Sequence, residues 1–438
     1  MTHPLKSFLP LSLFSCTLAL VAATGTLINP VNAVHAAWRQ DSPKAIVDEA
    51  WQIVNRDYVD ETFNKKDWQA IRKDLIGRDY TTKEQAYTAL RGALKQLDDP
   101  YTRFMDPKQY ESLTSQTSGE LSGVGIRLEA DIKTKVLTVV EPLPNSPAST
   151  AGIRSGDRVL AIDGRSTQGM TVEDASGLIR GKEGTRITLE IGRGEKDLIK
   201  MPLVRAKIEL QAVRYSSRQE GATKVGYIRL NEFSSHAADQ MRQAIKSLNK
   251  EKVDSFVLDL RGNPGGLLQA SVEISRMWMD QGGIVKTVDR KGGAEEISAN
   301  STAITNLPLA VLVDKNSASS SEILTGALKD NNRATIVGTD TFGKALVQSV
   351  HPLSDGSGLA VTIAHYYTPN GTDISHKGIM PDIVLALDRA QVERLSSNPK
   401  LVGTLDDPQY ARAVMALQKG ASKSAGLSAP LNQKKNSQ

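Results

Sequence analysis

Apolar residues recur at helical spacing in the part of the chain that follows residue 41. In SPKAIVDEAWQIVNRDYV they are three and four residues apart, which places them on one face of a helix. They are Ile46, Val47, Ala50, Ile53 and Val54. Ser42 suits the N-cap and Pro43 the first helical position. KDWQAIRKDLI and KEQAYTALRGALKQL repeat the pattern. We therefore predict an N-terminal helical region over residues 38–116 that pairs with segments near the C-terminus.

The pattern changes near residue 122 to short runs in which apolar and polar residues alternate. GVGIRLEA, KVLTVVEPL, DRVLAIDG and TRITLEIGR are such runs, and turn-forming Gly, Pro and Asp residues separate them. A period of two indicates strands with one buried face. One helix, over roughly 172–179, interrupts the strands, and the polar stretch 117–123 is interpreted as a linker. We predict a β-rich module over 117–206.

From residue 225 onward, strand patterns alternate with helix patterns. The order is KVGYIRL, a helix over 237–250, VDSFVLDL, a helix after Gly266, PLAVLVD, a serine-rich helix and RATIVG. This alternation indicates an α/β core with a largely parallel sheet, which we place at 207–388. LVQSVHPL and GLAVTIAHYYTP add strands at its end.

The remaining segments connect or end these parts. Residues 389–438 are predicted to hold a helix near 408–418 and a disordered polar tail from about 420 onward. We predict a hinge at 204–217, where the β-rich module meets the core. The fold class is therefore α+β and multidomain.

Composition and charge narrow the classes of partner. The chain has 438 residues, of which 39% are hydrophobic and 24% charged, an ordinary globular balance for two or three domains. The net charge is +5, and residues of opposite sign are interleaved rather than clustered. We therefore predict no nucleic-acid partner.

The first residues have the pattern of a targeting segment. Lys6 precedes a long apolar run, and small-residue sites follow at residues 31–33 and 34–36. This is the layout of an export signal, which we place at residues 1–37, with an uncleaved membrane anchor as the alternative. Cys16, the only cysteine, lies inside it, so the mature chain cannot use disulfides or thiol chemistry. No His/Cys cluster has metal-ligand spacing, and we predict neither a metal nor an organic cofactor.

A glycine loop enters the β-rich module at GVGI, residues Gly123, Val124, Gly125 and Ile126. Consecutive amides of such a loop can bind a carboxylate while the next strand edge accepts an extended peptide; a plain turn is the alternative. SPASTAGIRSGDRVLAIDG and the order of the surrounding elements resemble PDZ domains. The resemblance implies that the loop amides bind peptide C-termini with an apolar last side chain.

The window KNSASSSEILTGALKD concentrates serines at the start of a predicted helix. Ser319 followed by Glu322 fits a capping box. The other interpretation is that one hydroxyl is a nucleophile, which needs a base and a site for the oxyanion. No histidine stands in a G-x-S-x-G setting. The histidines outside the leader, interpreted as surface or core residues, are His236, His351, His365 and His376.

A lysine is the other candidate base. Its pKa must fall from about 10.4 towards 7, which costs about 4–5 kcal/mol of desolvation and requires apolar surroundings. Lys344 in TFGKALVQSV lies between Phe342 and an apolar run. An exposed loop lysine is the alternative.

The combined stretch KNSASSSEILTGALKDNNRATIVGTDTFGKALVQSV resembles the serine–lysine core of the carboxyl-terminal processing, or tail-specific, proteases. By this resemblance Ser319 is the nucleophile, Lys344, which follows it by 25 residues (344 − 319), is the base, and Gln348 orients the lysine. Asp330 stands where some members carry an acidic residue of functional weight. The capping and catalytic roles of Ser319 can coexist.

Two positions depart from the family pattern. Ser320 stands where the family often has Ala, which leaves open which serine is nucleophilic, and Ala345 stands where it usually has Gly. DLRGNPGG, residues 259–266, is shared with the family and supplies glycines at a helix entrance. We predict that the amides of Gly265 and Ser320 stabilise the oxyanion. A phosphate-binding loop is excluded because the Gly-Lys-Ser/Thr of a Walker motif is missing.

Three further stretches resemble the branch of this family that is found in cyanobacteria and chloroplast lumens. They are AWQIVNRDYVDETFN, LDDPYTRFMDP and SGLAVTIAHYYTPNGTDISHKGIMPD. This branch removes the C-terminal extension of the photosystem II D-one precursor. The resemblance implies a periplasmic or thylakoid-lumen serine endopeptidase that recognises protein tails and meets the thylakoid membrane surface through its substrate. The alternatives are a general periplasmic tail-specific protease and a non-catalytic PDZ adaptor.

Overall fold

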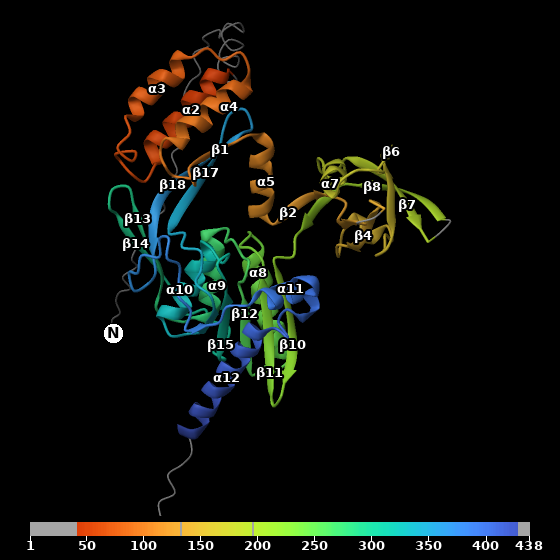
Figure 1. Cartoon of the computed structure of the whole chain (residues 1–438), viewed down its shortest axis with the longest axis vertical. Helices are drawn as coiled ribbons and strands as arrows, with labels where there is room; N and C mark the ends of the chain where they lie inside the picture. Colours follow the sequence, from red (N-terminus) through yellow and green to blue (C-terminus); the bar gives the residue numbers. More distant parts are fainter. Residues whose placement is uncertain (1–41, 132–133, 195–196, 428–438) are drawn as a thin grey trace, which may run out of the picture.

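The computed structural model describes residues 42–131, 134–194 and 197–427. Figure 1 shows a helical region at one end, a β-rich module to one side and a larger α/β core. The predicted export signal and Cys16 lie outside the described residues. Within those residues, no helix combines the length and the apolar character needed to cross a bilayer.

Three helices build the N-terminal region: α2 (Pro43–Asp57), α3 (Trp68–Gly77) and α4 (Lys83–Lys95). Ser42 caps α2 by accepting a hydrogen bond from the amide of Ala45, and Pro43 occupies the first helical position, as predicted. The buried residues of α2 are Ile46, Val47, Ala50, Trp51 and Val54, so the predicted face is confirmed except that Ile53 is only partly buried.

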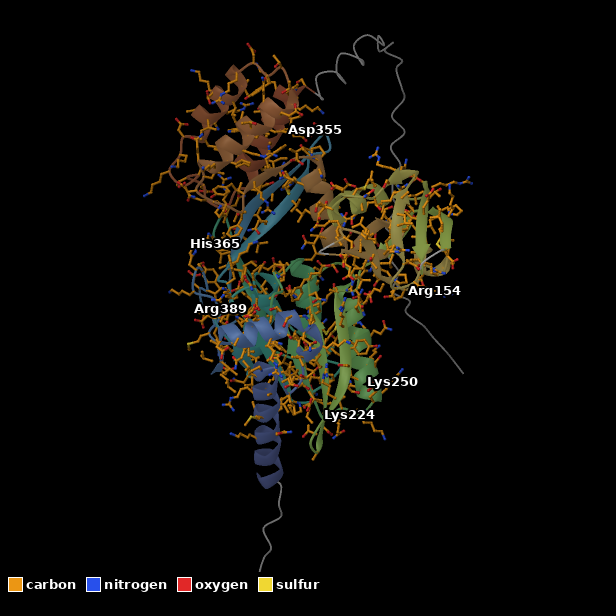
Figure 2. All side chains as sticks on the ribbon, turned by 45° about the vertical axis from the view of Figure 1, so that its right-hand side comes forward. Arg154, Lys224, Lys250, Asp355, His365 and Arg389 are labelled. Atoms are coloured by element: carbon orange, nitrogen blue, oxygen red, sulfur yellow. The ribbon has the colours of Figure 1, made fainter. Side chains whose placement is uncertain are left out.

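This helical core is completed by a hairpin from the other end of the chain. The hairpin consists of β17 (Leu346–Pro352) and β18 (Gly358–Tyr367), and its Leu353, Leu359 and Val361 belong to the same buried cluster as the helices. At its tip Asp355 accepts a hydrogen bond from the Tyr87 hydroxyl of α4. Figure 2 shows Asp355 beside the N-terminal helices and His365 further down the hairpin, near the core. The predicted pairing with C-terminal segments is confirmed.

The chain then runs along the core before it enters the module. The short strand β1 (Arg103–Met105) pairs with β18, and α5 (Pro107–Ser118) follows. Strand β2 (Glu120–Gly123) pairs with β9 (Ala206–Glu209), so two antiparallel strands join the module to the core where the hinge was predicted.

The interpretation of residues 117–123 as a linker is wrong. Helix α5 continues to Ser118, with the Thr117 hydroxyl donating to the Leu113 carbonyl, and Gly119 ends it at φ +68°. The strand β2 forms because β9, more than eighty residues later, supplies its partner, which the local pattern cannot reveal.

The β-rich module has a sheet in the order β3-β4-β5-β7-β8, with β6 paired to β5. Its strands are β3 (Ile126–Ala130), β4 (Leu137–Pro142), β5 (Arg158–Ile162), β6 (Arg165–Ser166), β7 (Arg186–Arg193) and β8 (Asp197–Val204). The helices are α6 (Pro147–Thr150) and α7 (Val172–Ile179), the latter as predicted. Both helices pack on one apolar core with the strands.

The core sheet has the order β10-β11-β12-β15-β16-β19. Only β10 is antiparallel to its neighbour, so the predicted largely parallel sheet is confirmed. Its strands are β10 (Val213–Glu220), β11 (Thr223–Leu230), β12 (Ser255–Asp259), β15 (Leu309–Val313), β16 (Thr335–Gly338) and β19 (Ile383–Val384). Helices cover both faces: α8 (Ala237–Lys250), α9 (Leu268–Trp278) and α10 (Ser320–Asp330) on one, and α12 (Pro408–Leu427) on the other. Strands β12 and β15 are therefore buried at every position.

A second sheet contains β1, β17, β18 and the hairpin of β13 (Gly283–Asp289) and β14 (Ala294–Ser298). The sequence pattern did not predict the β13–β14 hairpin. After β19 come α11 (Arg389–Ser397) and the short 3-10 helix Pro399–Leu401. The predicted disorder from about residue 420 is wrong as far as Leu427, because α12 continues to that residue; 428–438 lie outside the described part of the chain.

A buried ionic network fixes the start of α12 to the end of β12. Arg261 donates to both oxygens of Asp259 and of Asp407, with the shortest contacts at 2.7 Å, and also to the Gln409 side chain. The carboxylates of Asp259 and Asp407 are fully buried. This network holds the loop that follows β12, which carries DLRGNPGG.

We expect Asp407→Ala to destabilise the protein by about 3–5 kcal/mol, because it leaves the buried Arg261 guanidinium partly unpaired. Denaturant unfolding at neutral pH measures the change, and Asp406→Ala, which removes a neighbouring exposed carboxylate, is the matched control. A loss no larger than that of the control would contradict the role assigned to the network.

Candidate active site

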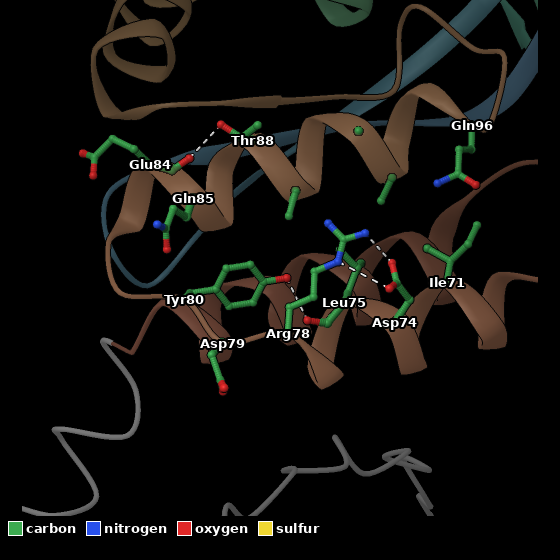
Figure 3. A pocket seen from close by; sticks show the side chains of 13 residues that line it. Ile71, Asp74, Leu75, Arg78, Asp79, Tyr80, Glu84, Gln85, Thr88 and Gln96 are labelled. Carbon is green, nitrogen blue, oxygen red and sulfur yellow. Dashed lines mark hydrogen bonds and ion pairs between the residues drawn. The ribbon is translucent and has the colours of Figure 1, made fainter.

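A large groove of about 640 Å³ between α3 and α4, shown in Figure 3, is a poor candidate. Asp74 and Arg78 form an ion pair in it. The hydroxyls of Thr88 and Tyr80 donate to the carbonyls of Glu84 and Leu75. Its described lining contains none of the predicted site residues, and its only hydroxyl groups, those of Thr88 and Tyr80, are engaged by backbone carbonyls.

The predicted serine, lysine and glutamine meet in another cavity, of about 240 Å³, between α5, α10 and the β17–β18 hairpin. We call it the Ser–Lys cavity. Its lining includes Arg103, Leu113, Gly266, Ser319, Ser320, Lys344, Gln348, Val350, Ala360 and Tyr366. Segments from the first quarter and the last quarter of the chain thus complete one site.

The serines of the window differ in what their hydroxyls do. Those of Ser317, Ser320 and Ser321 each donate to a backbone carbonyl of residues 260–266, at 2.9, 3.0 and 2.9 Å. All three residues are fully buried. Ser319 is partly exposed to the cavity and forms a capping box with Glu322, and within the described chain its hydroxyl donates to no acceptor. The three engaged serines attach the start of α10 to the loop after β12 and leave Ser319 as the accessible hydroxyl.

The backbone at Ser319 is unusual. Its φ of 54° and ψ of −115° lie in a region that residues with a side chain rarely adopt. Gly265 packs directly against it: a Cβ on Gly265 would lie 2.7 Å from the Ala318 carbonyl oxygen and 2.9 Å from the Ser319 Cβ. Strain of this kind persists only where the surrounding contacts fix it, and here the loop after β12 and α10 provide those contacts.

Free amides lie next to Ser319. Within the described chain, the amides of Ser320 and Gly266 have no hydrogen-bond acceptor. The amide of Gly265, predicted as an oxyanion donor, donates to the Asn263 side chain at 2.9 Å. It would have to leave this acceptor to bind an oxyanion. Ser320 begins α10, where the helix dipole favours negative charge.

Lys344 lies mostly buried on the opposite wall of the cavity. Its Nζ is 4.6 Å from the centroid of the Tyr101 ring. Burial, and secondly the positive charge of Arg103, lower the pKa of Lys344 to about 8, against opposing contributions from Asp99 and Glu322. A pKa of about 8 leaves a usable fraction of neutral amine near neutral pH.

Gln348 and Asp330 are placed differently. Gln348 lines the cavity with Lys344, and its buried Nε2 has no hydrogen-bond partner in the described chain. Asp330 lies at the far end of α10, where its carboxylate accepts the Asn370 amide at 2.9 Å. The structure therefore brings Gln348 to Lys344 without a direct hydrogen bond, and it keeps Asp330 away from the cavity lining.

Two residues that the sequence analysis did not assign to catalysis hold both sides of the site. The buried Glu322 carboxylate accepts a hydrogen bond from the Ser319 backbone amide at 2.9 Å. On the other wall it accepts hydrogen bonds from the backbone amides of Gly343 at 2.6 Å and Lys344 at 2.9 Å, and from the Thr341 hydroxyl at 2.6 Å. The Tyr366 hydroxyl lies between the carbonyls of Ser319 and Lys344. Only the capping-box spacing signalled Glu322, and nothing in the local sequence signalled Tyr366.

The glycine loop of the module also exposes amides. Gly125 has φ +77°, and its carbonyl accepts the Leu143 amide at 2.8 Å while that of Val124 accepts the Ala148 amide at 2.9 Å. Within the described residues, the amides of Val124 and Gly125 have no acceptor. Ile126 begins β3, so a free pair of amides stands at the start of a strand.

Comparison with known proteins identifies these parts. The sequence model of peptidase family S41 matches residues 224–385, and that of the PDZ domain matches 138–193. A carboxyl-terminal-processing protease of Picosynechococcus is 47% identical over 77% of this chain and 82% of its own. One from Synechocystis is 43% identical over 84% and 86%.

Among solved structures, a photosystem II D1 C-terminal processing protease is 37% identical, with a TM-score of 0.52, over 79% of this chain and 93% of its own. The residues around Ser319 and Lys344 thus lie inside the part matched by the peptidase model, and the glycine loop lies just before the part matched by the PDZ model. The chain belongs to peptidase family S41 and is a serine protease of the carboxyl-terminal-processing type.

Proposed function

We propose that this protease removes the C-terminal extension of the photosystem II D1 precursor after export to the periplasm or thylakoid lumen. The observation that carries the chemistry is that Ser319 presents the one unengaged hydroxyl of its window to a cavity that also holds a largely buried lysine. The substrate is supported by the 37% identity to the D1 processing protease and by the two cyanobacterial relatives. A general tail-specific protease is the alternative.

In the proposed mechanism, neutral Lys344 takes the proton of the Ser319 hydroxyl, which attacks the scissile carbonyl to form an acyl-enzyme. The oxyanion is bound by the Ser320 amide together with an amide of the loop after β12. That second amide is Gly265 after release from Asn263, or the adjacent free Gly266. The resulting ammonium of Lys344 protonates the leaving amine, and the neutral lysine then activates the water that hydrolyses the acyl-enzyme.

Gln348 is proposed to orient Lys344, since its amide has free hydrogen-bonding capacity in the same cavity. In the present arrangement Lys344 contacts the Tyr101 ring, so binding of substrate would draw the amine towards Ser319 and Gln348. For Asp330 we propose a structural role at the end of α10, because its carboxylate holds the Asn370 turn.

Glu322 is proposed as the positioning residue of the dyad. Its carboxylate binds backbone amides on both walls of the cavity, so it fixes the separation of nucleophile and base. Burial raises the pKa of Glu322, against the hydrogen bonds that lower it. Within the protein, this carboxylate is the group that couples the α10 start to the Lys344 loop.

The PDZ module is proposed to bind the substrate tail at residues 123–126. The free amides of Val124 and Gly125 suit a terminal carboxylate, and the edge of β3 suits an extended peptide. We also propose that the chain is divided into an export signal, a helical region, this module, the catalytic core and a C-terminal segment. Contact with the membrane surface would come through the substrate.

We expect protein without the leader to cut a D1 precursor C-terminal peptide at one position, and Ser319→Ala and Lys344→Ala to lose at least about a thousandfold in kcat, because each removes one half of the dyad. Mass spectrometry of the products measures this. Ser354→Ala, a serine outside the cavity, is the matched control. Many cuts in unrelated C-terminal peptides would favour the general protease, and unchanged activity in both variants would contradict the dyad.

We expect kcat/KM to rise with pH through an apparent pKa of about 8. The base must be neutral, and Lys344 is protonated below this pH and neutral above it. Initial rates between pH 6 and 10, with circular dichroism at each pH to verify folding, measure the profile. An acid limb near the ordinary lysine value of about 10.4 would contradict the lowered pKa of Lys344 on which the mechanism depends.

We expect Glu322→Gln to reduce kcat by about ten- to a hundredfold with little change in KM, because an amide can offer only one oxygen to donors that now use two. Steady-state kinetics measure the separation of kcat from KM, and Glu393→Gln on the exposed face of α11 is the control. Full activity of Glu322→Gln would reduce Glu322 to a helix cap.

A further inference from the structure

The Ser–Lys cavity adjoins a second groove of about 390 Å³ between β1 and α5, with which it shares Arg103 and Leu113. Among the described residues that line the two, Lys344, Arg103 and Arg91 are basic, and none is an aspartate or glutamate. Arg91 is already paired with Asp106 at 3.1 Å. The combined cleft is therefore positively charged, and Arg103 is its unpaired guanidinium.

The backbone holds Arg103 firmly in this place. In β1 it pairs with Ala360 of β18, which in turn pairs with Val350 of β17, and both partners line the Ser–Lys cavity. Just before it, the Asp99 carboxylate accepts the hydroxyls of Thr102 and Thr362, each at 2.7 Å. These bonds fix the segment to β18.

The side chains of this segment differ in what they face. Thr102, Phe104 and Met105 are buried, whereas Arg103 lines the Ser–Lys cavity and the Tyr101 ring contacts Lys344. Arg103 is exposed, and it makes no hydrogen bond or ion pair within the described chain. A guanidinium fixed at its backbone, open to a peptide-sized cleft and lacking a partner is suited to bind a carboxylate with two hydrogen bonds.

We propose that Arg103 determines substrate specificity by binding a carboxylate of the peptide close to the scissile bond, in the groove between β1 and α5. This inference rests on the proposed peptidase mechanism. The carboxylate comes either from an aspartate or glutamate side chain or from the terminus of a short tail. The site is separate from residues 123–126 of the PDZ module, to which α5 and β2 lead from the groove.

After burial, the charge of Arg103 is the second cause that lowers the pKa of Lys344. Removing the arginine would therefore slow every substrate equally at a fixed pH, which by itself would not indicate a contact with substrate. The ratio of kcat/KM between an acidic peptide and its neutral counterpart cancels this general effect. It isolates the contact between Arg103 and the peptide.

The test uses matched peptides that place Asp or Glu near the cleavage site, the same peptides with Asn or Gln, and both sets with free and amidated C-termini. For wild-type protein without the leader, we expect the acidic peptides to be preferred by about five- to tenfold in kcat/KM. Arg103→Gln should bring the ratio to about one. Arg103→Lys, which keeps the charge but loses the planar fork, should give an intermediate ratio.

Lys108→Gln removes an exposed charge outside the cleft and should keep the wild-type ratio. A ratio that depends on the side chain assigns the carboxylate to an acidic residue, and one that depends on amidation assigns it to the terminus. An equal ratio in wild type and Arg103→Gln, with both cleaving the neutral peptide, would overturn the inference and leave the mechanism intact. If wild type cleaves no peptide at all, the proposed function itself fails.

Discussion

The proposed catalytic arrangement depends on one buried carboxylate, that of Glu322. Its oxygens bind amides from the start of α10 and from the loop before β17, so the two halves of the site are held by hydrogen bonds to charge rather than by side-chain packing alone. Hydrogen bonds to a charged carboxylate are stronger than hydrogen bonds between neutral groups. A serine with φ of 54° can be maintained in this setting because its amide, its neighbours' hydroxyls and Gly265 all constrain it.

Segments that are distant in the sequence position the walls of the cavity around Glu322. Strand β12 of the parallel sheet leads into the loop of residues 259–266, and Arg261 fixes that loop to the start of α12. The β17–β18 hairpin carries the lysine side of the cavity and extends into the N-terminal helices, whose own segment 99–105 returns to cover the lysine. The helical region is therefore not an independent appendage, because the segment that follows it places Arg103 in the lining of the Ser–Lys cavity and the Tyr101 ring against Lys344.

Local sequence patterns predicted the elements whose signals are local. The cap at Ser42, the helix α7 and the strand–helix alternation of the core follow from periodicity and capping. The motif spacing singled out Ser319 and Lys344, and the structure places both in the lining of one cavity. The patterns could not supply contacts set by partners far away in sequence. Strand β2 needs β9, and Tyr366 and Arg103 reach the cavity only through the pairing of β18. The engagement of the Gly265 amide by Asn263 is likewise a matter of geometry that spacing does not encode.

The absence of carboxylates from the lining of the described cleft connects the proposed base to the proposed substrate. Burial is the main cause of the lowered pKa of Lys344 and the charge of Arg103 is the second, whereas Asp99 and Glu322, which lie outside the lining, raise it. The same lining leaves the positive charge of Arg103 in the groove that we propose for the peptide, and a carboxylate of the peptide is the proposed partner of that charge. In the proposed mechanism, the arginine that helps to lower the pKa of the base also binds the acidic peptide, so one guanidinium would serve both the activation of the base and the selection of the substrate.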